Sequence, residues 1–339
     1  MSLTAEKRGL KPLIFIGVTA AIFVAAVVSI CVGKYQISPA EIINILSGKA
    51  DVSDMSRKVF FTLRLPRTIM AIMAGTGLGI AGSVYQIIFK NPLASPDIIG
   101  VAGGANLGAA VAIVTISSSG MLGIATGAFW GGLLAVTCVM LLVKATGSTS
   151  TSTFVLAGII INAVSKAVIM ALKYFADPEN ELAAIEYWSM GTFGTTTQSK
   201  LLSILPMFLI GLIGILLLRR QIELMSLSDN ESRALGVRLR PIRITVLLLS
   251  TLLVSSIISI TGLISFAGLI APHISRLMLK RNNSVTMVMS GLVGSFVVLV
   301  ADIFARIVYS SELPISILTT VIGVPILVYF LVKRGKELV

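Results

Sequence analysis

Apolar residues occur in long runs along this chain, without the regular polar–apolar alternation of barrel strands. A helix needs about 20 apolar residues to cross a bilayer, and its backbone groups are then hydrogen-bonded within the segment. The pattern therefore predicts an all-α polytopic membrane protein with about ten transmembrane helices. We place these at residues 12–32, 65–89, 98–116, 121–143, 154–174, 200–218, 244–264, 262–281, 285–304 and 315–332.

Composition agrees with a membrane location. The chain is 55% hydrophobic and 12% charged, with a mean hydropathy of +0.97, whereas soluble domains carry about 25% charged residues. A charged loop at about 219–243 separates the predicted spans into two membrane halves. Because the halves can share one bundle, we interpret residues 1–339 as a single transmembrane domain.

Lysine and arginine are distributed unevenly over the predicted loops. With the N-terminus in the cytoplasm, the more basic loops fall on the cytoplasmic side, including the six arginines from Arg219 to Arg243. We therefore expect a multi-pass protein of the inner or plasma membrane with both termini in the cytoplasm. The net charge of +12 has the same explanation. No basic–aromatic platform accompanies it, so nucleic-acid binding is not predicted.

Glycine spacing inside the spans predicts close helix packing. The segment GLGIAG at 77–82 matches G-x-G-x-x-G, but that pattern binds a dinucleotide only between a strand and a helix, and here it lies mid-span. Gly75 and Gly79 are four residues apart, as are Gly127 and Gly131. This spacing allows two membrane helices to approach closely.

Signatures of catalysis are absent from the sequence. No G-x-x-x-x-G-K-[ST] phosphate loop occurs, so the chain is not itself an ATPase of that kind. The single histidine, His273, and the separated Cys31 and Cys138 form no metal-binding pattern. We expect no catalytic residue, no metal and no cofactor bound by this chain.

Three stretches go beyond generic membrane sequence: 63–109 with R-L-P-R and N-P-L-A-S-P, 227–237 with L-S-D-N-E-S-R-A-L-G-V, and 262–325 with P-H-I-S-R, A-D-I-F-A-R and E-L-P. Together they resemble the FecCD family, the permease subunits of ABC importers for iron-siderophores, haem and vitamin B12. The departures are small: Ala267 replaces the usual Val or Ile, and Ser316 the usual Gly.

The resemblance implies an assembly. It implies a homodimer or heterodimer of ten-helix permeases, two cytoplasmic ATPase subunits that bind ATP and Mg, and an external substrate-binding protein. The expected cargo is a ferric siderophore or related iron chelate, with haem or cobalamin as alternatives. An ion-coupled secondary transporter is the alternative of another class, and Asp302 is its one obvious near-membrane acid.

The charged loop contains the pattern of a short cytoplasmic helix. Ser228 or Asp229 is a suitable N-cap with acids in the first turn, and Gly236 is a suitable C-terminal stop. The alternative is a solvated loop. Given the resemblance, we expect this segment to be the coupling helix that docks on the ATPase. Its residues are Ser228, Asp229, Arg233, Ala234, Leu235, Gly236 and Val237.

Three arginines on the predicted outer side belong to the matched motifs: Arg64, Arg67 and Arg306. The resemblance implies that they meet acidic residues of the binding protein, which suits the planar guanidinium. The alternative is that they are anchors near the membrane surface.

Lys166 lies within the predicted fifth span, with Asn162 one helical turn before it. An ionisable residue there faces either the bundle interior, and so the translocation pathway, or the outer interface by snorkelling.

Two proline-containing breaks complete the motifs. Pro272, His273 and Arg276 are expected to end the eighth span at the cytoplasmic face as structural residues. Asn91 and Pro92 are expected in a cytoplasmic turn, with the inner mouth of the pathway as the more specific hypothesis.

Overall fold

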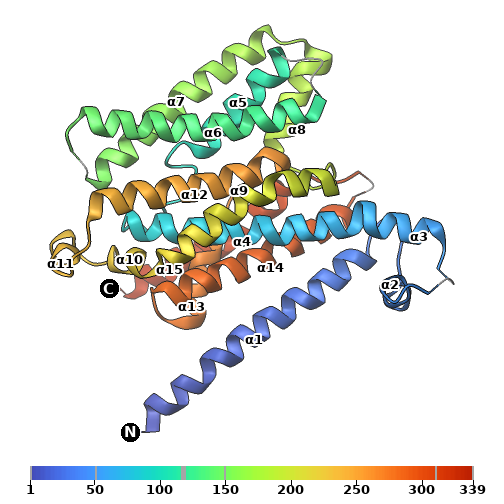
Figure 1. Cartoon of the computed structure of the whole chain (residues 1–339), viewed down its shortest axis with the longest axis horizontal. Helices are drawn as coiled ribbons and strands as arrows, with labels where there is room; N and C mark the ends of the chain where they lie inside the picture. The colour runs from blue at the N-terminus through green and yellow to red at the C-terminus, as the bar shows by residue number, and fades with distance from the viewer. Residues whose placement is uncertain (1, 50–51, 116–119, 149, 310, 338–339) are drawn as a thin grey trace. The chain divides into compact units, whose positions relative to one another are not determined.

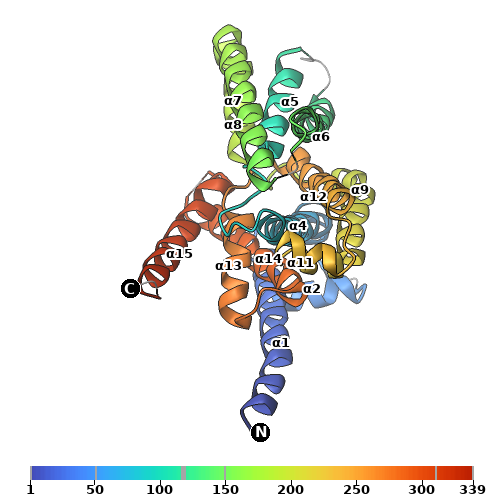
Figure 2. The ribbon, with the colours of Figure 1, turned by 90° about the vertical axis from the view of Figure 1, so that its left-hand side faces the viewer.

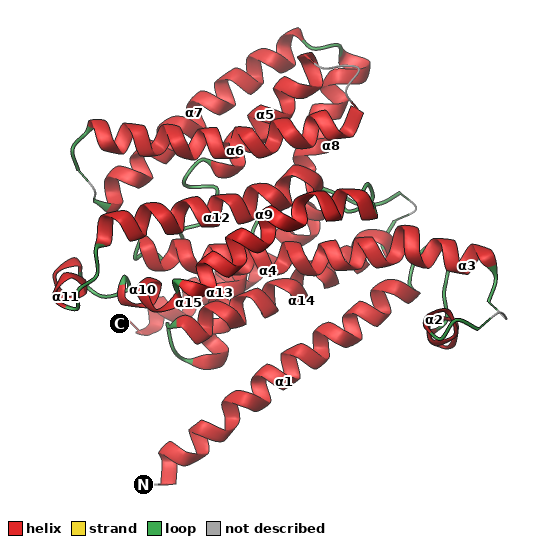
Figure 3. Cartoon of the chain, in the orientation of Figure 1, coloured by secondary structure: helices red, strands yellow, loops and turns green. Residues whose placement is uncertain are grey.

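The structure, a computed structural model, describes residues 2–49, 52–115, 120–148, 150–309 and 311–337. In these ranges all regular secondary structure is helical (Figure 3). Each predicted span corresponds to a helix, which confirms the all-α fold. The predicted end of the third span at Ile116 lies outside the described residues.

Seven helical segments of the described chain are long and apolar enough to cross a membrane: Pro12–Cys31, Asp54–Ile88, Leu122–Ala145, Thr151–Phe175, Gln198–Leu217, Leu239–Thr261 and Ser284–Ile307. Of the other three predicted spans, the third and the tenth contain the shorter apolar helices Val101–Thr115 and Ile315–Phe330, and the eighth is a helix of 13 residues, Ala267–Leu279. The third of the predicted spans, for example, is a helix of 15 residues, about 22 Å long, against a hydrocarbon thickness of about 30 Å.

The chain divides into two compact units, and the division does not fall at the charged loop. Unit 1 comprises Met1–Gly79, Phe193–Leu201 and Ser265–Val339. Unit 2 comprises Ile80–Thr192 and Leu202–Ile264. Two helices, α4 (Leu65–Ile88) and α9 (Gln198–Leu217), begin in unit 1 and end in unit 2.

Unit 1 is centred on α14, in which 72% of the most apolar stretch is buried. Its neighbours α1, α13 and α15 pack against it (Figure 1). The helices of this unit, besides the start of α4, are α1 (Ser2–Cys31), α2 (Pro39–Leu46), α3 (Asp54–Lys58), η1 (Val59–Arg64), α13 (Ala267–Leu279), α14 (Ser284–Ile307) and α15 (Ile315–Glu337).

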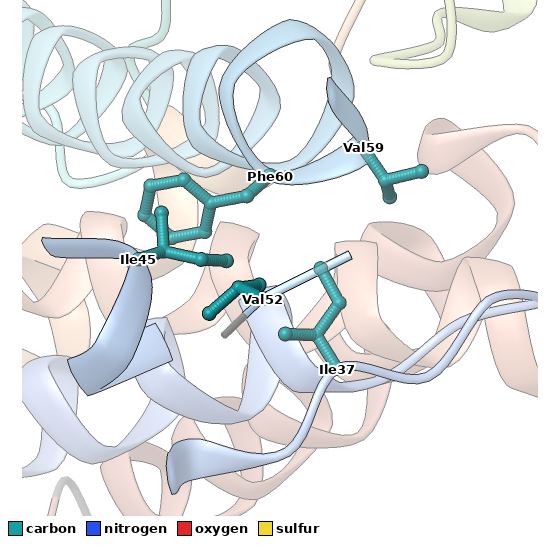
Figure 4. Close-up of a cluster of buried hydrophobic side chains, with 5 residues drawn as sticks. All are labelled: Ile37, Ile45, Val52, Val59 and Phe60. Atoms are coloured by element: carbon teal, nitrogen blue, oxygen red, sulfur yellow. The ribbon is translucent and has the colours of Figure 1, made fainter. Parts of the chain in front are cut away.

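A small apolar cluster secures the segment after α1. Ile37 and Val52 lie in loops, Ile45 lies in α2, and Val59 and Phe60 lie in η1 (Figure 4). All five side chains are buried. The stretch between α1 and α4, although polar on average, is therefore anchored by its own apolar contacts.

Unit 2 packs α5 against α6, with α7 and α12 beside them (Figure 2). Its helices, besides the parts of α4 and α9, are α5 (Val101–Thr115), α6 (Gly120–Ala145), α7 (Thr151–Phe175), η2 (Pro178–Leu182), α8 (Ala183–Met190), α10 (Arg219–Leu224), α11 (Asp229–Ala234) and α12 (Leu239–Thr261). In α12, 72% of the residues in its most apolar stretch are buried.

The predicted glycine contacts are present in both units. A Cβ added at Gly75 would collide with the backbone of Gly294 in α14, and one at Gly127 would collide with Gly108 in α5. The helices approach backbone to backbone, as small residues permit. Gly79, within 77–82, meets the backbone of Ser290 in the same way, which confirms that this segment packs against another helix.

The structure departs from or refines the predicted helix bounds in three places. The second span starts eleven residues earlier than 65, because α3, η1 and α4 form one continuous helix from Asp54. The predicted connector at 175–198 contains the short helices η2 and α8. Asp177 caps the N-terminus of η2 by accepting hydrogen bonds from the Glu179 and Asn180 N–H groups. The residues around His273 lie inside α13, which continues to Leu279.

The glycine contact between α4 and α14 can be tested by overpacking. We expect Gly75→Leu to destabilise the protein by about 1–3 kcal/mol, because the side chain would have to displace backbone. Thermal unfolding of the purified protein in detergent measures this. Gly17→Leu is the control, since nothing lies within 4 Å of a Cβ at Gly17. Equal melting temperatures for the two variants would contradict the contact.

Candidate functional site

An ionic cluster in unit 1 brings together residues far apart in the sequence. Arg67, near the start of α4, donates from Nε to Asp302 Oδ1 at 3.0 Å. Its Nη1 donates to both carboxylate oxygens of Glu312, at 2.8 and 2.9 Å. The motifs R-L-P-R, A-D-I-F-A-R and E-L-P therefore meet at one guanidinium.

The carboxylate of Asp302 is the centre of the ionic cluster. Its side chain is fully buried, with 0% exposed, and lies between Arg67 Nη2 at 2.9 Å and Arg306 Nη2 at 3.1 Å. Oδ2, the atom nearest Arg306, has no hydrogen bond of good geometry in the described residues, so this contact is an ion pair rather than a hydrogen bond. Two cations lie next to one buried carboxylate and offset its charge.

Arg306 also holds the C-terminal end of α1. Its Nη1 donates to the carbonyls of Ser29 and Val32 at 2.9 and 3.0 Å, and its Nη2 donates to Ser29 Oγ at 2.8 Å. The last carbonyls of a helix have no partner within the helix, and a cation there is favoured by the helix dipole. Arg306 thus serves as a cap supplied by another helix.

The π-helix η1 positions the arginines of the R-L-P-R motif. Pro66 lacks an N–H and its ring crowds the carbonyl four residues earlier, which lies in η1. The wider turn accommodates this, with Leu65 N–H bonded to Phe60 O. Arg64 then donates from Nη2 to Tyr35 O at 3.1 Å, in the loop after α1.

The predicted docking arginines are thus gathered in unit 1, and they are engaged there. Each is no more than 9% exposed: Arg64, Arg67 and Arg306. Of the acids around them, Glu312 alone is substantially open, with 40% of its side chain exposed. Contact with an outside carboxylate would require a rearrangement at Glu312.

A second candidate site, in unit 2, is the predicted coupling segment. Ser228 Oγ accepts from Glu231 N–H and the Glu231 carboxylate accepts from Ser228 N–H, a complete capping box that starts α11. Gly236 ends it with φ +81°, and the Gly236 and Val237 N–H groups donate to Arg233 O and Ser232 O. The short helix with these caps is therefore confirmed.

The outward side of α11 offers a small, partly apolar surface. Arg233, Ala234, Leu235 and Gly236 are exposed, with Leu235 at 59%, while Val237 is buried. A groove of about 450 Å³ adjoins this end of the helix, lined also by Arg220 and Arg238.

The N-terminal end of α11 is fixed by ion pairs. Lys90 Nζ, in the turn between α4 and α5, donates to Asp229 Oδ1 at 2.7 Å, and Arg243 Nη2 lies 3.8 Å from the same oxygen. The hydrogen bond from Lys90 holds the pKa of Asp229 below its usual range. In the same turn, Asn91 Oδ1 accepts from Leu93 N–H at 2.9 Å, which with Pro92 fixes the local bend.

The predicted pathway residues on α7 are in different situations. Asn162 donates from Nδ2 to Asp97 O at 2.6 Å and so ties α7 to the loop before α5. Lys166 is exposed, among exposed apolar neighbours such as Val164 and Val168. A pathway role for both stays a prediction.

His273 is a buried packing residue. The ring is 7% exposed, with Nδ1 2.8 Å from Leu269 O and an edge-to-face contact with Phe330 of α15. Pro272 is also buried, and Arg276 follows one turn later in α13. The expected helix end holds for Arg276, which lies in the last turn of α13, but not for Pro272, which is accommodated within the helix. Among the described residues no three His, Cys, Asp or Glu side chains gather as metal ligands.

Sequence reasoning did not assign Glu312 and Lys90 to a site, and it named Asp302 only as the near-membrane acid of the alternative ion-coupled transporter. The usable signal for Asp302 was a carboxylate inside an apolar run, which requires a buried cation as partner. Nothing local points to Arg67, which is 235 positions away.

Comparison with known proteins decides the family. The model of the FecCD transport family matches residues 21–333. The chain belongs to the FecCD transport family. As a FecCD protein it is a multi-pass permease of ABC importers, a class in which the permease is not itself the catalyst.

Relatives and a solved structure agree with this assignment. The FecCD chain is 36% identical over 330 residues to the molybdate import system permease protein MolB of Haemophilus influenzae, covering 96% of this chain and 97% of the relative. It is 30% identical over 334 residues to the iron(3+)-hydroxamate import system permease protein FhuG of Bacillus subtilis, covering 96% and 98%. A metal-chelate type ABC transporter solved in an inward-facing conformation matches with TM-score 0.85 and 34% identity, over 95% and 99% of the two chains.

The buried carboxylate of the ionic cluster gives a stability prediction. Asp302→Asn leaves Arg67 and Arg306 buried without their shared counter-charge, so we expect a loss of about 3–5 kcal/mol. Glu312→Gln, at a 40% exposed side chain, should cost no more than about 1 kcal/mol. Thermal unfolding in detergent distinguishes them, and a melting temperature for Asp302→Asn as high as for Glu312→Gln would refute the central role of Asp302.

Proposed function

We propose that this FecCD chain carries a ferric siderophore or related iron chelate across the cytoplasmic membrane. The cargo arrives from an external binding protein, and partner subunits hydrolyse ATP with Mg. The observation that carries this proposal is the near-complete match to a metal-chelate type ABC transporter. Two permease chains, identical or paralogous, form the pathway, with both termini of each in the cytoplasm.

Molybdate is a second candidate cargo, because the relative with 36% identity over nearly the whole chain is a molybdate permease. Haem and cobalamin, the other cargoes that the family resemblance implies, are bulkier alternatives within the same class.

Uptake into vesicles decides the cargo. The permease is reconstituted with its ATPase and binding protein, and vesicles are supplied with ⁵⁵Fe-loaded hydroxamate siderophore or with ⁹⁹Mo-molybdate. We expect ATP-dependent accumulation of ⁵⁵Fe and none of ⁹⁹Mo. Accumulation of ⁹⁹Mo alone would replace the iron-chelate proposal with molybdate import, and accumulation dependent on an ion gradient instead of ATP would overturn the ABC importer mechanism.

Coupling to the ATPase is the role that we propose for α11. Support comes from its capped, short form and from the exposed surface at Leu235 beside the groove. A helix fixed at its start and open at its end is suited to fit a cleft of another protein.

Gly236 tests this role through the backbone alone. Its φ is +81° and no atom lies within 4 Å of an added Cβ, so a substitution is opposed only by conformation. Gly236→Val should cost about 1–2 kcal/mol at this turn and lower transport, whereas Gly236→Asn, which tolerates positive φ, should retain most of it. Vesicle uptake and ATPase rates measure this, and Gly48→Val, with φ +72° and equally open space, is the control. Normal coupling in Gly236→Val would refute the role.

Docking of the binding protein is the role that we propose for the arginines of the ionic cluster. Because Arg67 already binds Glu312, an acidic side chain of the binding protein would compete with Glu312 for Nη1 of Arg67. Opposed charges would then fix the register of the complex. Lys166 and Asn162 are proposed, independently, to line the pathway.

Removing the competitor should strengthen docking. We expect Glu312→Gln to tighten binding of the binding protein up to about fivefold at low salt, with the gain falling as salt rises. Surface plasmon resonance on permease in nanodiscs measures it. Glu179→Gln removes the same charge elsewhere and is the control. If the two variants bind alike, Arg67 acts as an internal anchor and does not dock the partner.

A further inference from the structure

The turn that ends α4 has a lysine where glycine is usual. Lys90 has φ +48°, with its N–H donating to Ile87 O and the Asn91 N–H donating to Gln86 O. This is the hydrogen-bond pattern of a Schellman helix end, in which the left-handed residue is usually glycine because a Cβ is strained there. A strained residue that persists can be retained for its side chain.

The Lys90 side chain is used on α11. Its ammonium lies 2.7 Å from Asp229 Oδ1, at the first residue of that helix, and is 34% exposed. Arg243, 5% exposed near the start of α12, approaches the same oxygen. The other side of α11 is fixed to α10, since Ser232 Oγ donates to Leu224 O at 2.8 Å. The α4–α5 turn is thus joined to α11 by one exposed ion pair.

An exposed ion pair adds little to stability. It does fix the distance and direction between the two segments that it joins, here α11 and the α4–α5 turn. In that turn Asn91 and Pro92 lead toward α5. A displacement of α11 would therefore be passed to the end of α4 and the start of α5. Arg243 supports the carboxylate but belongs to α12, so Lys90 is the group that reaches across to the turn.

We propose that Lys90 and Asp229 are a positioning pair that makes the α4–α5 turn move with α11. This rests on the proposed docking of an ATPase at α11 and goes beyond it, because it assigns the route by which that docking reaches the membrane helices. Neither residue contacts nucleotide or cargo in this role.

The informative variant is Lys90→Gly. It keeps the left-handed turn, relieves the backbone strain and removes the side chain with its ammonium. In vesicles with ATPase and binding protein, we expect cargo moved per ATP to fall about three- to fivefold, the range open to an exposed ion pair. The melting temperature should stay equal or rise, which a merely structural role would not produce.

Charge exchange provides the second arm. Lys90→Asp and Asp229→Lys should each lower cargo moved per ATP. The double variant should recover part of the loss, since the pair is re-formed with reversed sign, although Arg243 then faces a cation. Lys280→Asp is the matched control. Lys280 also ends a helix with positive φ, +50°, and has no ion pair among the described residues.

The outcomes separate the two levels of inference. If the unaltered permease recruits no ABC ATPase and shows no ATP-dependent uptake, the proposed function fails and the positioning pair with it. If the unaltered permease transports and Lys90→Gly moves as much cargo per ATP as it does, only the positioning pair is overturned. The same holds if the double exchange is no better than the worse single variant.

Discussion

A carboxylate buried inside a largely apolar bundle is the constraint on which unit 1 depends. Asp302 has no exposed side-chain surface, and an isolated charge there would be very unfavourable. Its neutralisation requires Arg67 from α4 and Arg306 from its own helix, and Arg306 in turn binds the end of α1. One charge thus specifies the mutual placement of three helices, which non-directional apolar contacts would leave loosely defined.

Unit 2 is held together by a different kind of contact. Gly104 and Gly108 of α5 face Gly127 and Gly131 of α6, and the two helix backbones are in contact there. These helices are therefore held by close packing of their backbones, where unit 1 uses ion pairs. The ion pairs of unit 2 include that between Lys90 and Asp229, whose side chains are both partly exposed. The central charge of unit 1 is therefore fully buried, whereas both members of the Lys90–Asp229 pair of unit 2 are partly exposed.

Features set by local chemistry could be read from the sequence, and those set by distant partners could not. The apolar runs gave the spans, and Ser228 and Gly236 gave the bounds of α11, because caps act within a few residues. The start of the second span was missed because the polar stretch 54–64 continues α4 as helix, with a π turn that adjusts to Pro66. The partners of Arg67 were missed because Glu312 is 245 positions away and only the fold brings it near. His273 could not be placed because a proline ends some helices and is accommodated within others.

The helix from Asp54 to Ile88 has a consequence for the lipid around it. Its 35 residues extend over about 52 Å, whereas the hydrocarbon layer is about 30 Å thick. If the layer covers the Ile88 end, its opposite boundary falls close to Arg67, and η1 and α3 stand among the headgroups. Bilayer thickness then determines whether the surroundings of that guanidinium are wet or dry. A mismatch of a few ångströms costs only fractions of a kcal/mol per ångström, yet it acts where the charges of unit 1 are concentrated. The acyl-chain length of the lipids therefore affects the hydration of the ionic cluster as well as the thickness of the bilayer.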